Sequence, residues 1–283
     1  MSTPKHLRED PRVASVRVSA ASGDLAALVA TPEPGVAVRP GVLLVPGFTG
    51  SKEDFWHLLP LLADRGHSAI AIDLRGQCDS GGPEDVAAYS IDALAADIAV
   101  LLEASSEPLH VVAHSFGGLV CRAAILAGAP ARSLTLLGSG PGALSGPRAD
   151  LIAAMRSMLL DGGVPPVWEA TYALNASTHD ALPPDVRDFI ERRFLASPAA
   201  ALLGMGEALT TATDRTEELE KTGVPVLVAC GENDDAWPAS AQEDMAQRLG
   251  ARYVVFPRVG HSPNVDVPEA VVAELEGFWA TTD

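Results

Sequence analysis

The amino-acid sequence predicts an α/β fold: a doubly wound, mostly parallel, eight-stranded sheet with a helical cap inserted after strand six. Three observations lead to this prediction. Six short apolar runs lack polar alternation, as strands buried on both faces of a parallel sheet require. Helix-like segments alternate with these runs, which is typical of doubly wound sheets. One long stretch, residues 141–222, then interrupts the alternation.

The two opening strands are expected to pair as an antiparallel hairpin. Residues 13–19 alternate between polar and apolar side chains, which indicates a strand with one exposed face. Gly23 and Asp24 signal a turn before the apolar run 25–30. Residues 31–40 contain three prolines and are therefore expected to form a loop.

The remaining strands and helices follow from apolar runs and from apolar side chains at helical spacing. The buried strands are expected at residues 42–45, 69–72, 109–113, 134–137, 226–229 and 253–256. The helices that flank the sheet are expected at residues 54–65, 91–103 and 268–279. Ser90 stands before the second of these helices, where serine is a favoured N-cap.

Residues 141–222 contain helix-like segments and no buried-strand run. These segments lie at residues 151–160, 185–195 and 198–209. We therefore expect a single domain over residues 1–283, with residues 141–222 as a helical cap above the carboxyl ends of the strands. Ligands bind at that edge in open α/β sheets.

Charge and composition exclude several classes of protein. The chain has 20 Lys and Arg against 37 Asp and Glu, a formal net charge of −17. Nucleic acids and anionic membranes bind clustered basic residues, so neither is an expected partner. No apolar leader or membrane-length apolar run is visible, which predicts a cytoplasmic protein. The three scattered cysteines, Cys78, Cys121 and Cys230, have neither disulfide-scaffold nor zinc-site spacing.

The sharpest chemical signal lies at residues 111–119, where a buried strand ends at Ser115 and a helix begins. A serine nucleophile needs a tight strand-to-helix turn with small residues on both sides. Ala113 and Gly117, two residues before and after Ser115, meet that need. The alternative is a serine that only caps the helix.

A serine hydroxyl needs a base, and the base needs an orienting acid. His261 follows the strand at 253–256, and Asp234 follows the strand at 226–229. Both positions lie at carboxyl ends of parallel strands, so the two side chains can converge on Ser115. Glu232 and Asp235 are rival candidates for the acid.

Together these residues resemble the α/β-hydrolase superfamily, in its serine-nucleophile branch with a helical cap. The resemblance spans nearly the whole chain outside the cap. It is carried by residues 113–118, by 231–234 with Pro238, and by Gly260 with His261. It implies an α/β-hydrolase fold, and it favours Asp234 as the acid because the offsets from Gly231 and Pro238 match the family pattern.

The resemblance also implies an oxyanion hole. The loop at residues 45–50 follows the third strand, with Pro46 where the family usually has histidine. The implied donors are the backbone N–H groups of Phe48 and Phe116, which would stabilise a tetrahedral oxyanion. Residues 73–80 resemble the family's Asp-x-x-Gly-x-Gly-x-Ser loop, with Cys78 at the position of the second glycine.

We therefore expect a serine hydrolase that cleaves an ester, thioester or lactone of a small, largely apolar substrate through an acyl-enzyme. Ser115, Asp234 and His261 are the expected catalytic residues, and His114 and Trp237 are possible pocket residues. The serine nucleophile argues against the dehalogenase and epoxide-hydrolase branches.

We expect no cofactor and no metal. Residues 138–143 match the G-x-G-x-x-[GA] pattern of dinucleotide-binding loops, but they come late in the fold. Pro141 also lacks a backbone N–H that the pyrophosphate of a dinucleotide would need. The expected partner is a small-molecule substrate, and the protein is expected to be a monomer or a homodimer.

Other functions remain open at this point. One is a carbon–carbon bond hydrolase of vinylogous diketones, whose substrate carboxylate would need a basic partner. The candidates for that partner are Arg122, Arg148, Arg156 and Arg192. Two others are a non-catalytic ligand-binding protein and a lyase that uses His261 as general base.

Overall fold

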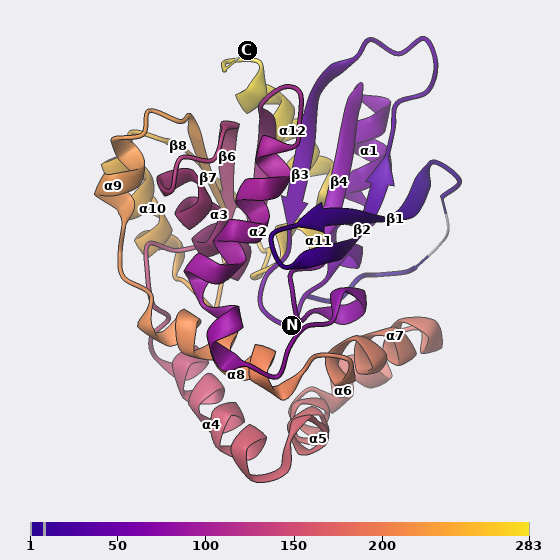
Figure 1. Ribbon diagram of the computed structural model, residues 1–283, viewed down its shortest axis with the longest axis vertical. Coiled ribbons are helices and arrows are strands. Elements are labelled where there is room, and N and C mark those ends of the chain that lie inside the picture. Colours follow the sequence, from indigo (N-terminus) through magenta and orange to yellow (C-terminus); the bar gives the residue numbers. More distant parts are fainter. Residues whose placement is uncertain (1, 8–9, 283) are drawn as a thin grey trace.

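Eight strands form one sheet in the order β1-β2-β4-β3-β5-β6-β7-β8 (Figure 1). The computed structural model describes residues 2–7 and 10–282. The strands are β1 (Val13–Ala20), β2 (Gly23–Ala30), β3 (Arg39–Val45), β4 (His67–Ile72), β5 (Leu109–His114), β6 (Ala131–Leu137), β7 (Val226–Gly231) and β8 (Arg252–Phe256). The pairs β1–β2 and β2–β4 are antiparallel, and all other pairs are parallel. This arrangement confirms the predicted fold class.

Helices cover both faces of the sheet. The longer ones are α1 (Leu58–Asp64), α2 (Ile91–Glu103), α3 (Phe116–Leu126), α10 (Ala239–Leu249) and α12 (Pro268–Trp279). The short ones are η1 (Lys52–Phe55), η2 (Cys78–Ser80), η3 (Val86–Tyr89), α9 (Thr216–Glu220) and α11 (Pro263–Asp266). No helix in the described ranges is both long enough and apolar enough to cross a membrane.

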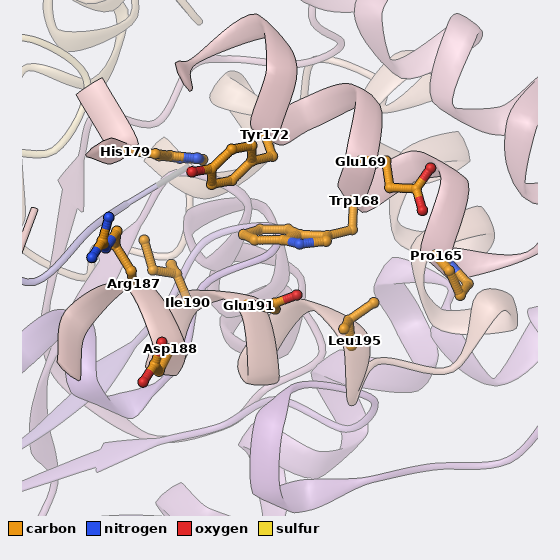
Figure 2. Close-up of a pocket in the computed structure, with 10 residues that line it drawn as sticks. All are labelled: Pro165, Trp168, Glu169, Tyr172, His179, Arg187, Asp188, Ile190, Glu191 and Leu195. Carbon is orange, nitrogen blue, oxygen red and sulfur yellow. The ribbon is translucent and has the colours of Figure 1, made fainter. Parts of the chain in front are cut away.

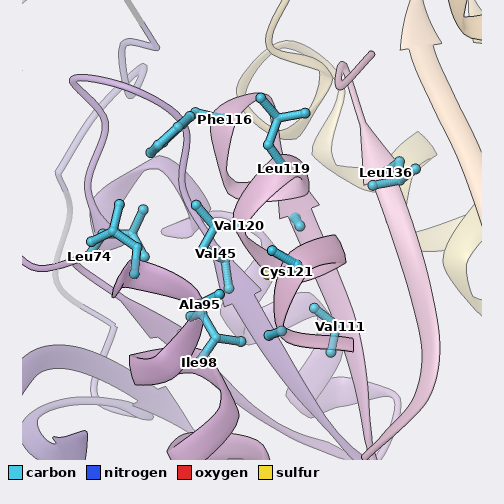
Figure 3. Packing of buried hydrophobic residues seen from close by; sticks show 14 of the residues in the cluster. Val45, Leu74, Ala95, Ile98, Val111, Phe116, Leu119, Val120, Cys121 and Leu136 are labelled. Atoms are coloured by element: carbon cyan, nitrogen blue, oxygen red, sulfur yellow. The ribbon is translucent and has the colours of Figure 1, made fainter. Parts of the chain in front are cut away.

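The central strands are apolar throughout because both of their faces are buried. In β5, Val111 and Ala113 join the apolar cluster formed with α2 and α3, whereas Val112 joins the cluster formed with α1 and α12. Figure 3 shows the first of these faces, where Val120 and Cys121 of α3 lie close to the sheet. The same double burial explains the unbroken apolar runs of the other central strands.

The prediction of one continuous helix over residues 54–65 was wrong. The structure has the short helix η1, a break at Trp56 and His57, and then α1 from Leu58. Pro60 explains the break, because proline inside a helix has no N–H to donate and clashes with the preceding turn. Starting the helix at Leu58 places Pro60 in the first turn, where neither problem arises.

Six helices lie between β6 and β7, and we call the first five of them the helical insertion. They are α4 (Pro147–Gly162), α5 (Val164–Leu174), α6 (Ala176–Asp180), α7 (Pro184–Leu195) and α8 (Ala199–Thr211). Figure 1 shows them gathered at one end of the sheet. Four of them, α4, α5, α7 and α8, share an apolar cluster that includes Trp168, Phe194 and Leu202, and Phe48 from the loop after β3 packs against it.

One buried ion pair joins the helical insertion to the sheet. Arg193 of α7 donates to Asp54 of η1 at 2.7 Å, and both side chains are almost fully buried. The same guanidinium donates to the carbonyl oxygen of Ser2. Because each charge is removed from water, each depends on its partner for stabilisation.

We predict that Arg193→Met lowers the free energy of unfolding by about 3–5 kcal/mol, because it leaves the Asp54 carboxylate buried without its opposite charge. Urea unfolding of the variant and the wild type measures the difference. Arg192→Met is the matched control, since Arg192 is exposed on the same helix. Equal losses in the two variants would contradict the prediction.

Candidate active site

Ser115 lies at a sharp turn between β5 and α3. Its backbone has φ 54° and ψ −121°, a conformation that L residues rarely adopt. Its N–H donates to the carbonyl oxygen of Leu137 at 2.9 Å, which holds the turn against β6. The turn also requires Gly117, because a Cβ atom there would lie 2.6 Å from the carbonyl oxygen of Pro46.

The structure brings Ser115, His261 and Asp234 into one hydrogen-bonded chain. Nε2 of His261 lies 2.9 Å from Oγ of Ser115, and Nδ1 lies 2.8 Å from Oδ1 of Asp234. A carboxylate can only accept, so the Nδ1 proton is donated to Asp234 and Nε2 carries the lone pair. The imidazole is therefore oriented to take a proton from the serine hydroxyl.

Several donors converge on the Asp234 carboxylate. Oδ1 accepts from the N–H of Ala236 at 2.9 Å, and Oδ2 accepts from Nε2 of Gln242 at 2.9 Å. Burial by itself would raise the pKa of Asp234, but the hydrogen bond from His261 and these donors together lower it. Asp234 is therefore ionised at neutral pH, as an orienting acid must be.

The two rival acids point elsewhere. The Asp235 carboxylate is exposed and accepts from Arg148 at 2.7 Å. Glu232 accepts from the backbone N–H of Arg258 at 2.8 Å. Of the three candidate acids, Asp234 is the one in contact with His261.

The loop after β3 lies against Ser115. A Cβ atom added to Gly47 would lie 2.8 Å from Cβ of Ser115 and 3.3 Å from its Oγ, so this position has room only for glycine. The backbone N–H groups of Phe48 and Phe116 follow Gly47 and Ser115. Neither N–H donates to another group in the part of the chain that the structure describes. Two such donors beside a nucleophile can stabilise an oxyanion.

His114 and Trp237, the possible pocket residues, both contact the His261 segment. Nε2 of His114 donates to the carbonyl oxygen of His261 at 2.9 Å, and the two rings are 5.0 Å apart. Trp237 lies 6.3 Å from the His261 ring and donates to the carbonyl oxygen of Gly142 at 3.0 Å. Both side chains are almost fully buried.

Burial, reinforced by the neighbouring His261, lowers the pKa of His114 from 6.5 to about 3. His114 is therefore neutral in the folded protein but takes up a proton in the unfolded chain once the pH falls below 6.5. The stability that depends on this pKa difference is present above pH 6.5 and is lost as the pH falls toward 3.

We predict that stability falls by about 2 kcal/mol more in the wild type than in His114→Gln between about pH 7 and about pH 5. Glutamine retains a donor for the His261 carbonyl but does not titrate. Urea unfolding of both proteins at the two pH values measures the difference. Parallel losses would contradict a neutral, buried His114.

Sequence reasoning missed Gln242. This side chain is fully buried, and its Nε2 donates to Asp234 at 2.9 Å and to the carbonyl oxygen of Trp237 at 2.8 Å. One signal could have found it. Gln242, Met245 and Ala246 have helical spacing in α10, which places the glutamine on the apolar face of that helix.

Glu53, Asp73 and Cys78 bring possible metal-ligand atoms within 4.8 Å of one another. The Lys52 ammonium already lies among them, 2.9 Å from Glu53 and 2.9 Å from Asp73. Burial raises the pKa of the Cys78 thiol to about 12, which keeps it protonated and a poor ligand. A lysine therefore supplies the positive charge that these carboxylates balance.

A pocket of about 550 Å³ lies in the helical insertion, apart from Ser115, His261 and Asp234. Its lining residues all belong to α5, α6 and α7, and Figure 2 shows Trp168 at its centre between α5 and α7. The loops that carry Ser115, Asp234 and His261 do not contribute to it. This pocket is therefore a feature of the insertion and not the space in front of the serine.

Comparison with known proteins places the chain in a family. Residues 42–275 match the model of the alpha/beta hydrolase family. A putative carbamate hydrolase, RutD, from Variovorax paradoxus is 30% identical over 87% of this chain and 94% of its own. A putative 2-succinyl-6-hydroxy-2,4-cyclohexadiene-1-carboxylate synthase from Bacillus subtilis is 28% identical over 84% of this chain and 90% of its own.

Solved structures show the same fold. A thermophilic esterase from Thermogutta terrifontis superposes with a TM-score of 0.73 at 24% identity, covering 95% of this chain and 99% of its own. The family match spans most of the sheet and the loops that carry Ser115, Asp234 and His261. The chain therefore belongs to the alpha/beta hydrolase family, and it is an enzyme of the hydrolase type.

Proposed function

We propose that this protein is a serine hydrolase that cleaves an ester of a small, largely apolar molecule through an acyl-enzyme. The observation that carries the proposal is the chain of two hydrogen bonds, 2.9 Å and 2.8 Å long, that links Ser115 through His261 to Asp234. A serine, a histidine and an ionised aspartate in this order form the arrangement that activates a hydroxyl for acyl transfer.

In this mechanism, Oγ of Ser115 attacks the ester carbonyl carbon while Nε2 of His261 takes the hydroxyl proton. The carbonyl oxygen becomes an oxyanion that the N–H groups of Phe48 and Phe116 stabilise. Collapse of the intermediate expels the alcohol, which receives the proton from His261. Water then attacks the acyl-enzyme by the same route and releases the acid and Ser115.

We further propose that the helical insertion, within the expected cap at residues 141–222, covers the catalytic loops and shapes the substrate site. Phe48 supports this role, because its ring reaches the apolar side chains of the insertion. A Cβ atom at Gly206 of α8 would lie 3.9 Å from the Phe48 ring and 3.7 Å from Met155. Apolar walls of this kind favour a largely apolar acyl or alcohol group.

Intact-mass measurement after incubation with a fluorophosphonate tests the proposal. We expect one stoichiometric adduct on the wild type and none on Ser115→Ala. Short p-nitrophenyl esters should then be turned over rapidly, whereas a carbon–carbon hydrolase would be poor with them. A folded wild type that takes no adduct, even from a small phosphonate, would refute the serine-hydrolase mechanism.

A further inference from the structure

A buried glutamine, Gln77, bridges the loops that follow β4 and β3. Its Oε1 accepts from the N–H of Leu74 at 3.0 Å, and its Nε2 donates to the carbonyl oxygen of Gly47 at 2.8 Å. The side chain is 2% exposed. Because one partner can only donate and the other can only accept, the amide has a single favourable orientation.

The Gly47 carbonyl and the Phe48 N–H belong to the same peptide group. Among the described residues the peptide bonds are trans, so this C=O and this N–H point in opposite directions. Gln77 fixes the direction of the carbonyl and thereby also fixes the direction of the N–H.

Gly47, which supplies the carbonyl group of this peptide, lies directly beside Ser115. A Cβ atom on Gly47 would meet Cβ of Ser115 at 2.8 Å and its Oγ at 3.3 Å. Gln77 contacts the carbonyl oxygen of this peptide, and among the described residues its side chain makes no hydrogen bond to Ser115. Its influence on Ser115 chemistry would therefore pass through the peptide.

The peptide has one other restraint, a turn. The N–H of Gly50 donates to the Gly47 carbonyl at 3.0 Å, and Thr49 within the turn has φ 58°. A threonine in the left-handed region costs about 1–2 kcal/mol, so the turn by itself holds this geometry against a local strain. The bond from Gln77 adds a second restraint on the same oxygen.

Ion pairs and a backbone hydrogen bond hold the loop that carries Gln77 in place. Asp73, at the start of the same loop, accepts from the backbone N–H of Lys52 at 2.7 Å and from its ammonium at 2.9 Å. The Lys52 ammonium also donates to Asp79 at 2.6 Å. These bonds tie the loop after β4 to the segment that follows the Gly47 turn, so the two loops behave as one unit.

We propose that Gln77 is a positioning residue that holds the Phe48 N–H toward the oxyanion formed on Ser115. The inference rests on the proposed function. An oxyanion exists in the transition state and not in the bound substrate, so a misdirected donor lowers kcat and leaves KM nearly unchanged.

Two substitutions test the proposal. Gln77→Met has similar length but no donor or acceptor for these bonds. Gln77→Glu has the same shape, and its protonated form can donate to Gly47 and accept from Leu74, whereas its ionised form cannot donate. Gln247→Met, at an exposed position of α10, is the control.

We expect Gln77→Met to lower kcat about tenfold or more per active site titrated with fluorophosphonate, short of the 10²–10³-fold lost when such a donor is removed outright. For Gln77→Glu, the ratio of its kcat to that of the wild type should rise as the pH is lowered. The same ratio for Gln77→Met should stay flat, because methionine does not titrate.

Three results would overturn the role of Gln77 while leaving the proposed function intact. They are an unchanged kcat per titrated site in Gln77→Met, a pH-independent ratio for Gln77→Glu, and a fall in melting temperature with no fall in kcat. Should Gln77→Met fail to fold, the test rests on Gln77→Glu alone, through the pH dependence of its kcat relative to that of the wild type. A wild type that takes no phosphonyl label overturns the proposed function and this inference with it.

Discussion

Replacing Ser115 with alanine is expected to lower kcat for a p-nitrophenyl ester by about 10⁵- to 10⁶-fold, because the attacking oxygen is lost. The other two residues of the hydrogen-bonded chain cannot contribute to acyl transfer without this oxygen. His261 would have no hydroxyl proton to accept, and Asp234 would orient a base that activates nothing. Some acceleration over the uncatalysed reaction should remain, because the backbone donors and the substrate site are still present.

Initial rates of purified Ser115→Ala and of the wild type measure this loss. Ser106→Ala is the matched control, since Ser106 is exposed in the loop before β5. Thermal unfolding establishes that both variants are folded. If Ser115→Ala retains activity within tenfold of the control, Ser115 is not the nucleophile, and a mechanism with His261 as general base becomes the better explanation.

Asp234→Asn is expected to lower kcat by about 10⁴-fold, with a smaller change in KM. Asparagine has nearly the same shape but carries no charge. It cannot offset the imidazolium that forms when His261 takes the serine proton. The hydrogen bonds from Ala236 and Gln242 are arranged around a carboxylate, so an amide NH₂ group at either oxygen position would also face a donor.

The rival acids supply the controls for this prediction. Asp235→Asn removes an exposed carboxylate that pairs with Arg148, and Glu232→Gln removes one that accepts from a backbone N–H. Both variants should retain activity within a few-fold of the wild type. A large loss in Asp235→Asn, with little loss in Asp234→Asn, would assign the acid to the other residue.

The fold class followed from local patterns that the structure confirms. Apolar runs without alternation predicted strands buried on both faces, and Val111 and Val112 do lie in the separate apolar clusters on the two faces. Where a competing local rule applied, the prediction failed. The spacing of apolar side chains suggested one helix over residues 54–65, but Pro60 forces the helix to begin at Leu58.

The candidate site also contains residues that local sequence patterns predict and residues that they do not. Ser115 was predicted as the nucleophile because a tight strand-to-helix turn needs small neighbours, which is a local requirement of the backbone. Gln77 carries no such mark, because it is a single buried polar side chain whose acceptor, the Gly47 carbonyl, lies 30 residues earlier in the chain. Gln242 is marked only by its helical spacing with Met245 and Ala246, which indicates burial but identifies no partner.

The sequence by itself therefore determined the order of the eight strands, the turn at which Ser115 lies, and the residue types that could activate its hydroxyl. Those properties depend on backbone sterics and on burial patterns within a few residues. The tertiary structure showed that the preferred acid, Asp234, contacts His261. It alone decided which acidic residue pairs with Arg193 and which amide holds the Gly47–Phe48 peptide. Hydrogen bonds and ion pairs between distant residues leave no periodic trace in the sequence, because they form only when the folded sheet brings its loops together.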